Sequence, residues 1–276
     1  MTLPGTAIEA TRPLSMKNVT VGIKTFMRPE ALAECLEGLR DFEFANIIVA
    51  DDNPPTYEAA YQKVYDFYGK VLQLHVLRLP HDLGVAASRN RIAAATNTEF
   101  LLLLDDDQVI NSTVTLLYDV LVSDAHIGGV AGFFHEKKGE KCSACDIYFE
   151  NEYIVKELRR VPSKYYTEKR TEYSLFDFIP SATLFRLQCL EDVPWDPYYK
   201  TGAEHLDFYV CQKQLGKWKF AVAPDAYIDH IRYDRDEYNS TAYLAERKGP
   251  KFIKSWEHFN AKFSVRGKIE GHKLKD

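Results

Sequence analysis

The 276-residue sequence contains no apolar run of the roughly eighteen residues that a membrane-spanning helix requires. The segment from Met1 to Asn18 also lacks the basic-then-apolar order of a signal peptide. Five cysteines are an odd number, and Cys35, Cys189 and Cys211 lie in apolar segments, as buried thiols commonly do. We therefore expect a soluble, cytoplasmic protein from a reducing compartment.

The sequence also lacks a long block of positive charge. Its net charge of -5 comes from interspersed residues of both signs, and only the tail after Lys248 is richer in Lys and Arg. This pattern predicts no nucleic-acid partner and favours a small phosphorylated ligand. Two alternatives stay open: the basic tail binds the inner face of a membrane peripherally, or the chain is part of a larger, membrane-anchored protein.

Zinc is not indicated, because Cys142 and Cys145 form a lone CxxC without a second pair. With 46% hydrophobic and 13% aromatic residues, the chain is instead typical of a globular domain. Apolar strands alternate with helices through the first half. The predicted strands are 19–26, 46–50, 72–79, 100–105 and 127–134, and the predicted helices begin at Pro29, Val85 and Ser112. This order predicts an α/β fold with a mostly parallel central sheet flanked by helices.

The second half is less regular. Residues 137–173 are polar and tyrosine-rich without clear periodicity, which predicts an insertion over the sheet. Further along, the pattern predicts strands over 176–185, 218–222 and 226–230 and a helix over 203–215. The tail beyond Arg235 is weakly patterned, so we expect it either to fold over a cleft or to stay mobile.

Three adjacent carboxylates, Asp105, Asp106 and Asp107, follow the apolar run that begins at Phe100. Because side chains alternate along a strand, we expect Asp105 and Asp107 on one side and Asp106 on the other. Two carboxylates facing a cleft suit Mn²⁺ or Mg²⁺, which keep positions open for substrate phosphates. The alternative is a solvated acidic turn.

Two other acidic pairs deserve a functional interpretation. Asp51 and Asp52 end another predicted strand, so they are expected to converge with the triple aspartate at the carboxyl edge of the sheet. Glu204 and Asp207 lie three residues apart in the first turn of a predicted helix and are expected to share one face. One of them suits a general base, and the alternative is that both simply complement the helix start.

The ordered motifs resemble family-2-like glycosyltransferases of the GT-A fold. They are Thr25, an aspartate after the second strand, Gly84 with Ser88-Arg89-Asn90, and Asp105-x-Asp107. The later segments Trp195-Asp196, Gly202–Phe208 and Pro224–His230 are similar to the β-1,4-N-acetylgalactosaminyltransferase (ganglioside-synthase-like) branch. The resemblance covers roughly Val19 to His230. It implies an N-terminal extension 1–17, a GT-A domain 18–234 with a nucleotide-sugar half 18–136 and an acceptor half 137–234, and a tail 235–276.

This resemblance implies roles for particular residues. Asp107, His230 and Asp105 would hold the metal, and Asp207 would be the base with Glu204 on the acceptor or donor sugar, or the reverse. Trp195 and His205 would contact sugar, although a buried tryptophan is equally expected, and His205 departs from the acidic run of some relatives. The residues assigned to the nucleotide sugar are Thr25, Arg28, Asp51, Asp52, Gly84, Arg89, Asn90, Asp105 and Asp106. Arg89 has the alternative of an ion pair that orders the cleft.

The function that the resemblance implies is inverting, metal-dependent transfer of a hexose or N-acetylhexosamine. The donor would be a UDP-sugar and the acceptor a hydroxyl of a glycan or glycoconjugate. A retaining mechanism, a sugar nucleotidyltransferase and a non-catalytic nucleotide-sugar-binding module are the alternatives. The nucleotidyltransferase is disfavoured because the loop from Lys24 to Pro29 contains no glycine.

Overall fold

The computed structural model describes residues 13–231, 241–272 and 274. Thus the first twelve residues of the predicted N-terminal extension and the start of the predicted tail lie outside the described residues. The described strands are β1 Leu14–Thr25, β2 Phe42–Asp51, β3 Leu74–Arg78, β4 Phe100–Asp105, β5 Gln108–Ile110, β6 Ile127–Glu136, β7 Gly139–Lys141, β8 Asp146–Glu150, β9 Tyr153–Glu157, β10 Tyr165–Tyr166, β11 Glu172–Phe176, β12 Thr183–Arg186, β13 Lys219–His230 and β14 Gly267–Glu270.

Eight α-helices are described along the same residues. They are α1 Pro29–Glu37, α2 Glu58–Tyr68, α3 Val85–Ala95, α4 Thr115–Ser123, α5 Leu187–Asp192, α6 Glu204–Leu215, α7 Thr241–Lys248 and α8 Pro250–Phe263. Short 3₁₀ turns at Pro55–Tyr57 and Ser112–Val114 precede α2 and α4.

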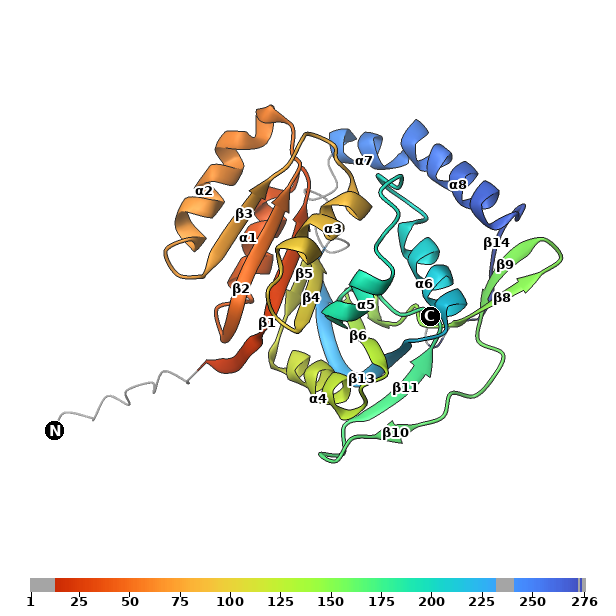
Figure 1. The fold of residues 1–276 in the computed structure, drawn as a ribbon. Helices are drawn as coiled ribbons and strands as arrows, with labels where there is room; N and C mark the ends of the chain where they lie inside the picture. Colours follow the sequence, from red (N-terminus) through yellow and green to blue (C-terminus); the bar gives the residue numbers. More distant parts are fainter. Residues whose placement is uncertain (1–12, 232–240, 273, 275–276) are drawn as a thin grey trace.

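A large mixed sheet forms the centre of the molecule, with helices on both faces (Figure 1). Its strand order is β10-β11-β13-β6-β12-β4-β1-β2-β3. Strands β4, β1, β2 and β3 are parallel, and β13 is parallel to β6, whereas β12 and β11 run antiparallel to their neighbours. The predicted α/β class, with helices flanking a central sheet, is therefore confirmed, and the sheet is mixed, with its parallel part at β4, β1, β2 and β3.

Strand β4 shows why an uninterrupted apolar run forms a strand here. Leu102 and Leu104 belong to a core that includes α1, α2 and α4, whereas Leu101 and Leu103 belong to a second core with α3, α5, α6 and α8. Both faces of the strand are buried, as in a parallel sheet covered by helices. Each buried leucine contributes roughly 1.5–3 kcal/mol relative to exposure, so this strand anchors the aspartates that follow it.

The described part of the tail folds back onto the domain. Phe259 of α8 is fully buried in the second core, and β14 pairs in parallel with β9 in a separate three-stranded sheet. In Figure 1, α7 and α8 run across the molecule above α3 and α6. Of the two predicted alternatives, the described tail takes the one in which it folds over the cleft.

Several expected elements differ in the structure. Residues 137–173 contain β7 to β10 and the start of β11 rather than an irregular insertion. The strand expected over 176–185 is divided between β11 and β12, and Pro180, which has no N–H to donate, lies in the connection. The two strands expected over 218–222 and 226–230 are one strand, β13, with a register irregularity between Val222 and Tyr227.

Helix α2 was not predicted from the sequence. The residues that it buries are Tyr61, Tyr65 and Tyr68, which recur at helical spacing but carry polar hydroxyls. Tyrosine is intermediate between apolar and polar residues in burial, so this stripe is inconspicuous in a hydrophobicity pattern.

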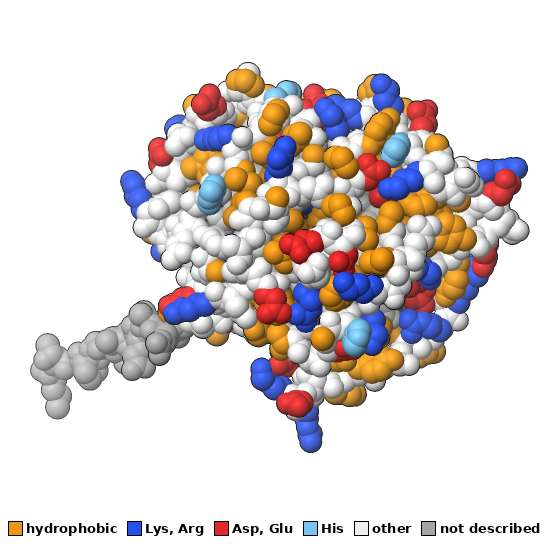
Figure 2. Space-filling view, viewed as in Figure 1, with side chains coloured by type: hydrophobic (Ala, Val, Ile, Leu, Met, Phe, Trp, Pro, Cys, Tyr) orange, Lys and Arg blue, Asp and Glu red, His pale blue; other side chains and the backbone are white. Residues whose placement is uncertain are grey.

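Charge is mixed on the surface. On the face drawn in Figure 2, acidic and basic side chains are interspersed among hydrophobic ones, without one broad area of a single sign. None of the described helices combines the length and the apolar character needed to cross a bilayer.

Candidate active site

A cavity of about 210 Å³ lies where β1, β2 and β4 end, and we call it the strand-end cavity. It brings together many of the predicted site residues, which are Arg28, Asp52, Gly84, Arg89, Asp105, Asp106, Asp107, Glu204, His205 and His230. Thr25, Asp51, Asn90, Trp195 and Asp207, which were also predicted, do not line it. This position at the carboxyl edge of the parallel part of the sheet is where α/β proteins bind ligands.

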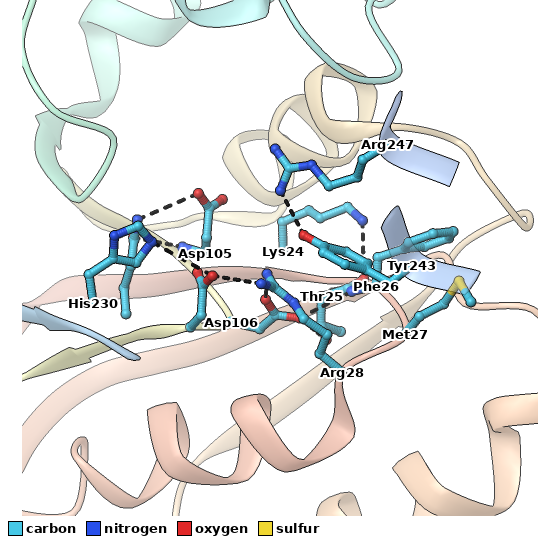
Figure 3. A network of polar contacts seen from close by, with 12 residues as sticks. Lys24, Thr25, Phe26, Met27, Arg28, Asp105, Asp106, His230, Tyr243 and Arg247 are labelled. Atoms are coloured by element: carbon cyan, nitrogen blue, oxygen red, sulfur yellow. Dashed lines mark hydrogen bonds and ion pairs between the residues drawn. The ribbon is translucent and has the colours of Figure 1, made fainter. Parts of the chain in front are cut away.

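All three aspartates after β4 line the strand-end cavity. The alternation expected for them is wrong, because β4 ends at Asp105 and the next two residues form a turn before β5. Asp105 turns toward Arg89, whose Nη2 donates to its Oδ1 at 2.9 Å, whereas Asp106 and Asp107 both turn toward Arg28. Figure 3 shows the carboxylate of Asp105 pointing away from Arg28.

Arg28, at the start of α1, bridges the two remaining carboxylates. Its Nη1 donates to Asp107 Oδ2 at 2.6 Å, its Nη2 pairs with Asp106, and only 6% of the residue is exposed. The guanidinium also lies 4.6 Å from the ring centroid of Tyr243 on α7 (Figure 3). Burial alone would lower the pKa of Arg28, but the negative charges of Asp106 and Asp107 outweigh burial and raise the pKa above its usual value. Arg28 is therefore a permanent cation beside these two aspartates.

The pKa values of Asp105 and Asp106 are shifted in opposite directions. Burial raises the pKa of Asp106 above its usual range, and the opposing charge of Arg28 does not offset this. Burial also acts to raise the pKa of Asp105, but there Arg89 outweighs it and the pKa is lowered.

Thr25, at the end of β1, holds the side chain of Asp106 in place by a hydrogen bond. Its Oγ1 donates to Asp106 Oδ2 at 2.8 Å and lies 2.8 Å from the hydroxyl of Tyr61. The backbone N–H of Phe26 donates to the same Asp106 oxygen. The side chain of Thr25 is fully buried, so the expected direct contact with the nucleotide is replaced by a hydrogen bond that positions Asp106.

The structure decides which aspartate after β2 faces the cavity. Asp52 lines it, accepts from the backbone N–H of Gly84 at 2.9 Å and pairs with Lys24 at 2.9 Å. Asp51 points to the other side, where Tyr65 donates to it at 2.9 Å and Arg78 at 2.5 Å. The expected nucleotide contact by Asp51 is therefore corrected to a structural ion pair.

Gly84 has a structural reason to be glycine. Its φ is +97°, and an added Cβ would lie 2.5 Å from the Cα of Lys200. Only glycine adopts this conformation without strain and leaves room for the neighbouring loop. The turn places the start of α3 at the strand-end cavity.

Helix α3 directs Arg89 and Asn90 differently. Arg89 reaches the cavity, where it contacts Asp105 and His205, as the predicted cleft-ordering ion pair would. Asn90 instead exchanges hydrogen bonds with the backbone of Trp195, at 2.7 and 3.0 Å. Trp195 is 2% exposed and stacks on Phe208, with ring centroids 4.6 Å apart. The expected sugar contact of Trp195 is therefore corrected to core packing, which Asn90 supports.

His230 lies beside Asp107 because β5 pairs with the end of β13, with Gln108 opposite His230. The distance from His230 Nε2 to Asp107 Oδ2 is 3.7 Å, and Nδ1 lies 2.7 Å from Glu136 Oε1. Such a carboxylate on the second ring nitrogen is typical of metal-binding histidines. No group of three or more candidate metal ligands occurs among the described residues. A Mg²⁺ or Mn²⁺ site that relies on substrate phosphates needs only one or two protein carboxylates, so the donor set of Asp107 and His230 fits.

Glu204 and Asp207 do not share one environment. Glu204, the first residue of α6, lines the strand-end cavity, and its Oε2 is buried without a hydrogen-bond partner among the described residues. Asp207 accepts from Tyr199 at 3.0 Å and pairs with Lys262 of α8 at 2.7 Å. Burial raises the pKa of Asp207, and Lys262 opposes this. The i, i+3 spacing did bring the two residues to one turn, but Asp207 points toward α8.

His205 lies between Arg89 and Glu204. It lines the cavity, contacts Arg89 at 3.1 Å and lies 3.7 Å from Glu204. Burial and then the charge of Arg89 lower the pKa of His205 to about 4, so the imidazole is neutral at neutral pH.

The contribution of the tail to the cavity was not predicted from the sequence. Tyr243, Glu246, Arg247 and Lys251 of α7 and α8 line the strand-end cavity, and Arg247 donates to the Tyr243 hydroxyl at 2.7 Å. These residues lie in a weakly patterned segment, so no sequence signal placed them at the strand ends. Lys24 and Lys200 were also missed, and each pairs with an aspartate, Asp52 and Asp82 respectively.

Comparison with known proteins identifies the class. The glycosyl transferase family 2 model matches residues 20–193, more than half of the chain, and the chain belongs to that family. Its fold is the GT-A fold of glycosyltransferases. No curated protein matches the sequence.

Solved structures show the same fold at low sequence identity. Residues 1–349 of TarS from S. aureus superpose with a TM-score of 0.55 at 18% identity, covering 91% of this chain and 73% of that chain. GalNAc-T7 with UDP, GalNAc and Mn²⁺ gives a TM-score of 0.61 at 13% identity, covering 90% of this chain and 55% of that chain. A further TarS structure is covered over only 44% of its length.

Proposed function

We propose that this chain is an inverting, metal-dependent glycosyltransferase that transfers a hexose or N-acetylhexosamine from a UDP-sugar to a hydroxyl of a glycan or glycoconjugate. The convergence of Asp107, Asp52 and Glu204 around one cavity carries this proposal. These residues come from three separate parts of the chain, and each suits a different part of such a reaction. Structures of TarS with UDP-GlcNAc and of GalNAc-T7 with UDP support a UDP-sugar as the donor.

The nucleotide would bind along the ends of β1 and β2. Asp52 is the carboxylate there, and it accepts hydrogen bonds of the kind that a uracil imide or a ribose hydroxyl would supply. Lys24, Arg28 and Arg247 supply positive charge around the same cavity, as a diphosphate requires.

Asp107 and His230 would hold the metal, with Glu136 orienting the imidazole. A bound Mn²⁺ or Mg²⁺ would stabilise the negative charge that develops on the leaving diphosphate. Arg28 already donates a hydrogen bond to Asp107. When the metal binds, Arg28 would either share the Asp107 carboxylate with the metal or release it. Thr25 keeps Asp106 in place during either arrangement.

Glu204 is the proposed general base, which reverses the first assignment made from the sequence. Its buried Oε2 has no other hydrogen-bond partner among the described residues, whereas Asp207 is committed to Lys262 and Tyr199. In the proposed step the acceptor oxygen attacks the anomeric carbon, the bond to the diphosphate breaks, and Glu204 takes the proton. Attack opposite the leaving group inverts the anomeric centre.

The finer resemblance to the β-1,4-N-acetylgalactosaminyltransferase branch stays part of this proposal. It would make the donor a UDP-N-acetylhexosamine. The proposed division into an N-terminal extension, two halves of residues 18–234 and a tail is kept as well, although the tail also lines the cavity.

A donor screen tests the function without an acceptor. Purified protein is incubated with Mn²⁺ or Mg²⁺ and a panel of UDP-, GDP- and dTDP-sugars, and the nucleotide released by slow hydrolysis is measured. We expect release from one UDP-sugar, which a chelator abolishes. Asp107→Ala should reduce it on the order of 10²–10³-fold, because charge stabilisation of the leaving group is lost.

Asp225→Asn is the matched control, since Asp225 is an exposed carboxylate on β13. It should release nucleotide at the normal rate. Metal-dependent UDP binding with no turnover, even with a glycan acceptor, would favour the non-catalytic module. Absence of UDP binding would contradict the proposal.

A further inference from the structure

A second cavity, of about 860 Å³, adjoins the strand-end cavity, and we call it the tail cavity. Five residues line both, namely Thr201, Glu204, His205, Tyr243 and Arg247. The rest of its wall comes from the start of α6, from α7 and α8, and from β9 and β14. The proposed base therefore also lines a second, larger space.

The tail cavity is positively charged. Of the described residues that line it, Lys156, Arg247 and Lys268 are cationic and Glu204 is the one carboxylate. Glu270 lies beside the wall and pairs with both lysines, at 3.6 Å to Lys156 and 2.8 Å to Lys268, so it offsets one of the three positive charges. One positive charge is left in excess in a protein whose net charge is -5.

Lys156 is the most unusual of these cations, because the residue is only 6% exposed. Its Nζ lies 3.7 Å from the ring centroid of Phe178, which stabilises the ammonium by a cation–π interaction. Its charge also reaches the site, since Lys156 contributes, after burial and Arg89, to the lowered pKa of His205. A nearly buried ammonium in the cavity that the proposed base also lines favours a negative group on whatever binds there.

Aromatic side chains form another part of the wall. Phe252 and Trp256 of α8 both line the tail cavity, with ring centroids 6.3 Å apart. Lys268 Nζ lies 4.6 Å from the ring centroid of Trp256, so an aromatic face and a cation are adjacent. Aromatic rings bind the apolar face of a sugar, and the cation beside them can bind an anionic substituent.

We propose that the tail cavity is the acceptor site and that the acceptor is an anionic glycan. A sugar ring would lie against Trp256, and a carboxylate or phosphate on the glycan would pair with Lys156 and Lys268. The acceptor hydroxyl would then face Glu204, which lines both cavities. This inference rests on the proposed glycosyltransferase function and adds the chemical class of its acceptor.

Three gluco-oligosaccharides of equal length test the inference: a neutral one, one with a terminal glucuronate and one with a terminal 6-phosphate. Their binding to the full chain is measured by calorimetry with UDP and Mn²⁺ present. The two anionic oligosaccharides should bind about tenfold more tightly than the neutral one, because each pairs with a cation next to a desolvated aromatic surface. That preference should shrink at high salt. A difference between glucuronate and phosphate would identify which anion the site takes.

Lys268→Gln should remove most of the preference for the anionic oligosaccharides and should weaken their binding more than that of the neutral one. Lys268 is partly exposed, so this variant is expected to fold. Lys254→Gln is the matched control, because Lys254 is exposed on α8 and does not line the cavity. It should bind all three oligosaccharides normally.

Equal binding of neutral and anionic oligosaccharides, or a preference that Lys268→Gln leaves intact, would overturn the inference. Hydrolysis of a UDP-sugar, measured on the same preparation without acceptor, separates this failure from failure of the proposed function. If hydrolysis occurs and the preference is absent, only the acceptor class is wrong. If UDP does not bind, the function itself is wrong.

Discussion

The two cavities that meet at Glu204 are built in different ways. The strand-end cavity lies where β1, β2 and β4 of one sheet end, and these strand ends supply Asp52 and the three consecutive aspartates that begin at Asp105. The tail cavity is assembled from α7, α8 and β14, which are consecutive in the tail, and from β9 and the start of α6, which come earlier in the chain. In the proposed function, the sheet would carry the donor chemistry, whereas the additions to the sheet would carry the specificity for the acceptor.

The largest expected effect is on the rate of transfer and concerns Glu204, which lines both cavities. Glu204→Gln should lower transfer to acceptor by about 10²–10⁴-fold, the usual contribution of a general base, with donor binding retained. Asp207→Asn should leave transfer within about threefold and instead lower the free energy of unfolding by about 1–3 kcal/mol, because Lys262 loses its buried partner. Transfer assays and thermal unfolding of both variants measure this contrast.

Glu257→Gln is the control for this pair, because Glu257 is an exposed carboxylate on α8. The opposite result, with Asp207→Asn inactive and Glu204→Gln active, would restore the first assignment of the base.

Arg28 tests how the strand-end cavity balances its own charge. Arg28→Gln leaves Asp106 and Asp107 close together without their cation, and breaking such a buried pair costs about 3–5 kcal/mol. Without added metal, the midpoint of thermal unfolding should therefore fall. Mn²⁺ should restore more of the stability of this variant than of the unmodified protein, because it would take over the role of the guanidinium.

Arg40→Gln serves as the comparison, since Arg40 pairs with Glu37 at an exposed position. An Arg28→Gln protein whose unfolding midpoint does not respond to Mn²⁺ would argue against a metal at Asp107.

The two aspartates at the end of β2 offer a smaller effect within the strand-end cavity. Asp52→Asn should weaken UDP binding by about tenfold, as loss of a hydrogen bond to a charged group does. Asp51→Asn should leave UDP affinity unchanged and should mainly weaken the contacts with Tyr65 and Arg78. Titration of both variants with UDP measures the difference, and equal weakening would show that Asp51 also reaches the nucleotide.

The last prediction is a pH dependence of stability, not of activity, at His205, which lines both cavities. The pKa of His205 is about 4 in the folded protein and 6.5 as an ordinary value, so between these limits the unfolded chain binds the proton and the folded one does not. Stability should therefore fall as the pH is lowered from about 6.5 to about 4. His205→Asn should reduce this slope in thermal unfolding measured across the window. An unchanged slope would place the titration elsewhere.

Much of the strand-end cavity could be predicted from the sequence alone. An apolar run that ends in Asp105, Asp106 and Asp107 marks a buried strand and its edge, because only a strand covered on both faces tolerates such a run. The β–α order then predicts that the ends of parallel strands meet. Both inferences follow from local sequence patterns and from strand pairing. Neither requires knowledge of other contacts between residues far apart in the sequence.

Only the tertiary structure decided which way each side chain turns and what the tail contributes. Asp51 and Asp52 are neighbours of the same type, yet Arg78 draws one away and Gly84 holds the other at the cavity. Trp195 packs in the core because Phe208 offers it a stacking partner. Local patterns record periodicity and chain order, whereas these outcomes depend on long-range ion pairs and packing that no short segment encodes.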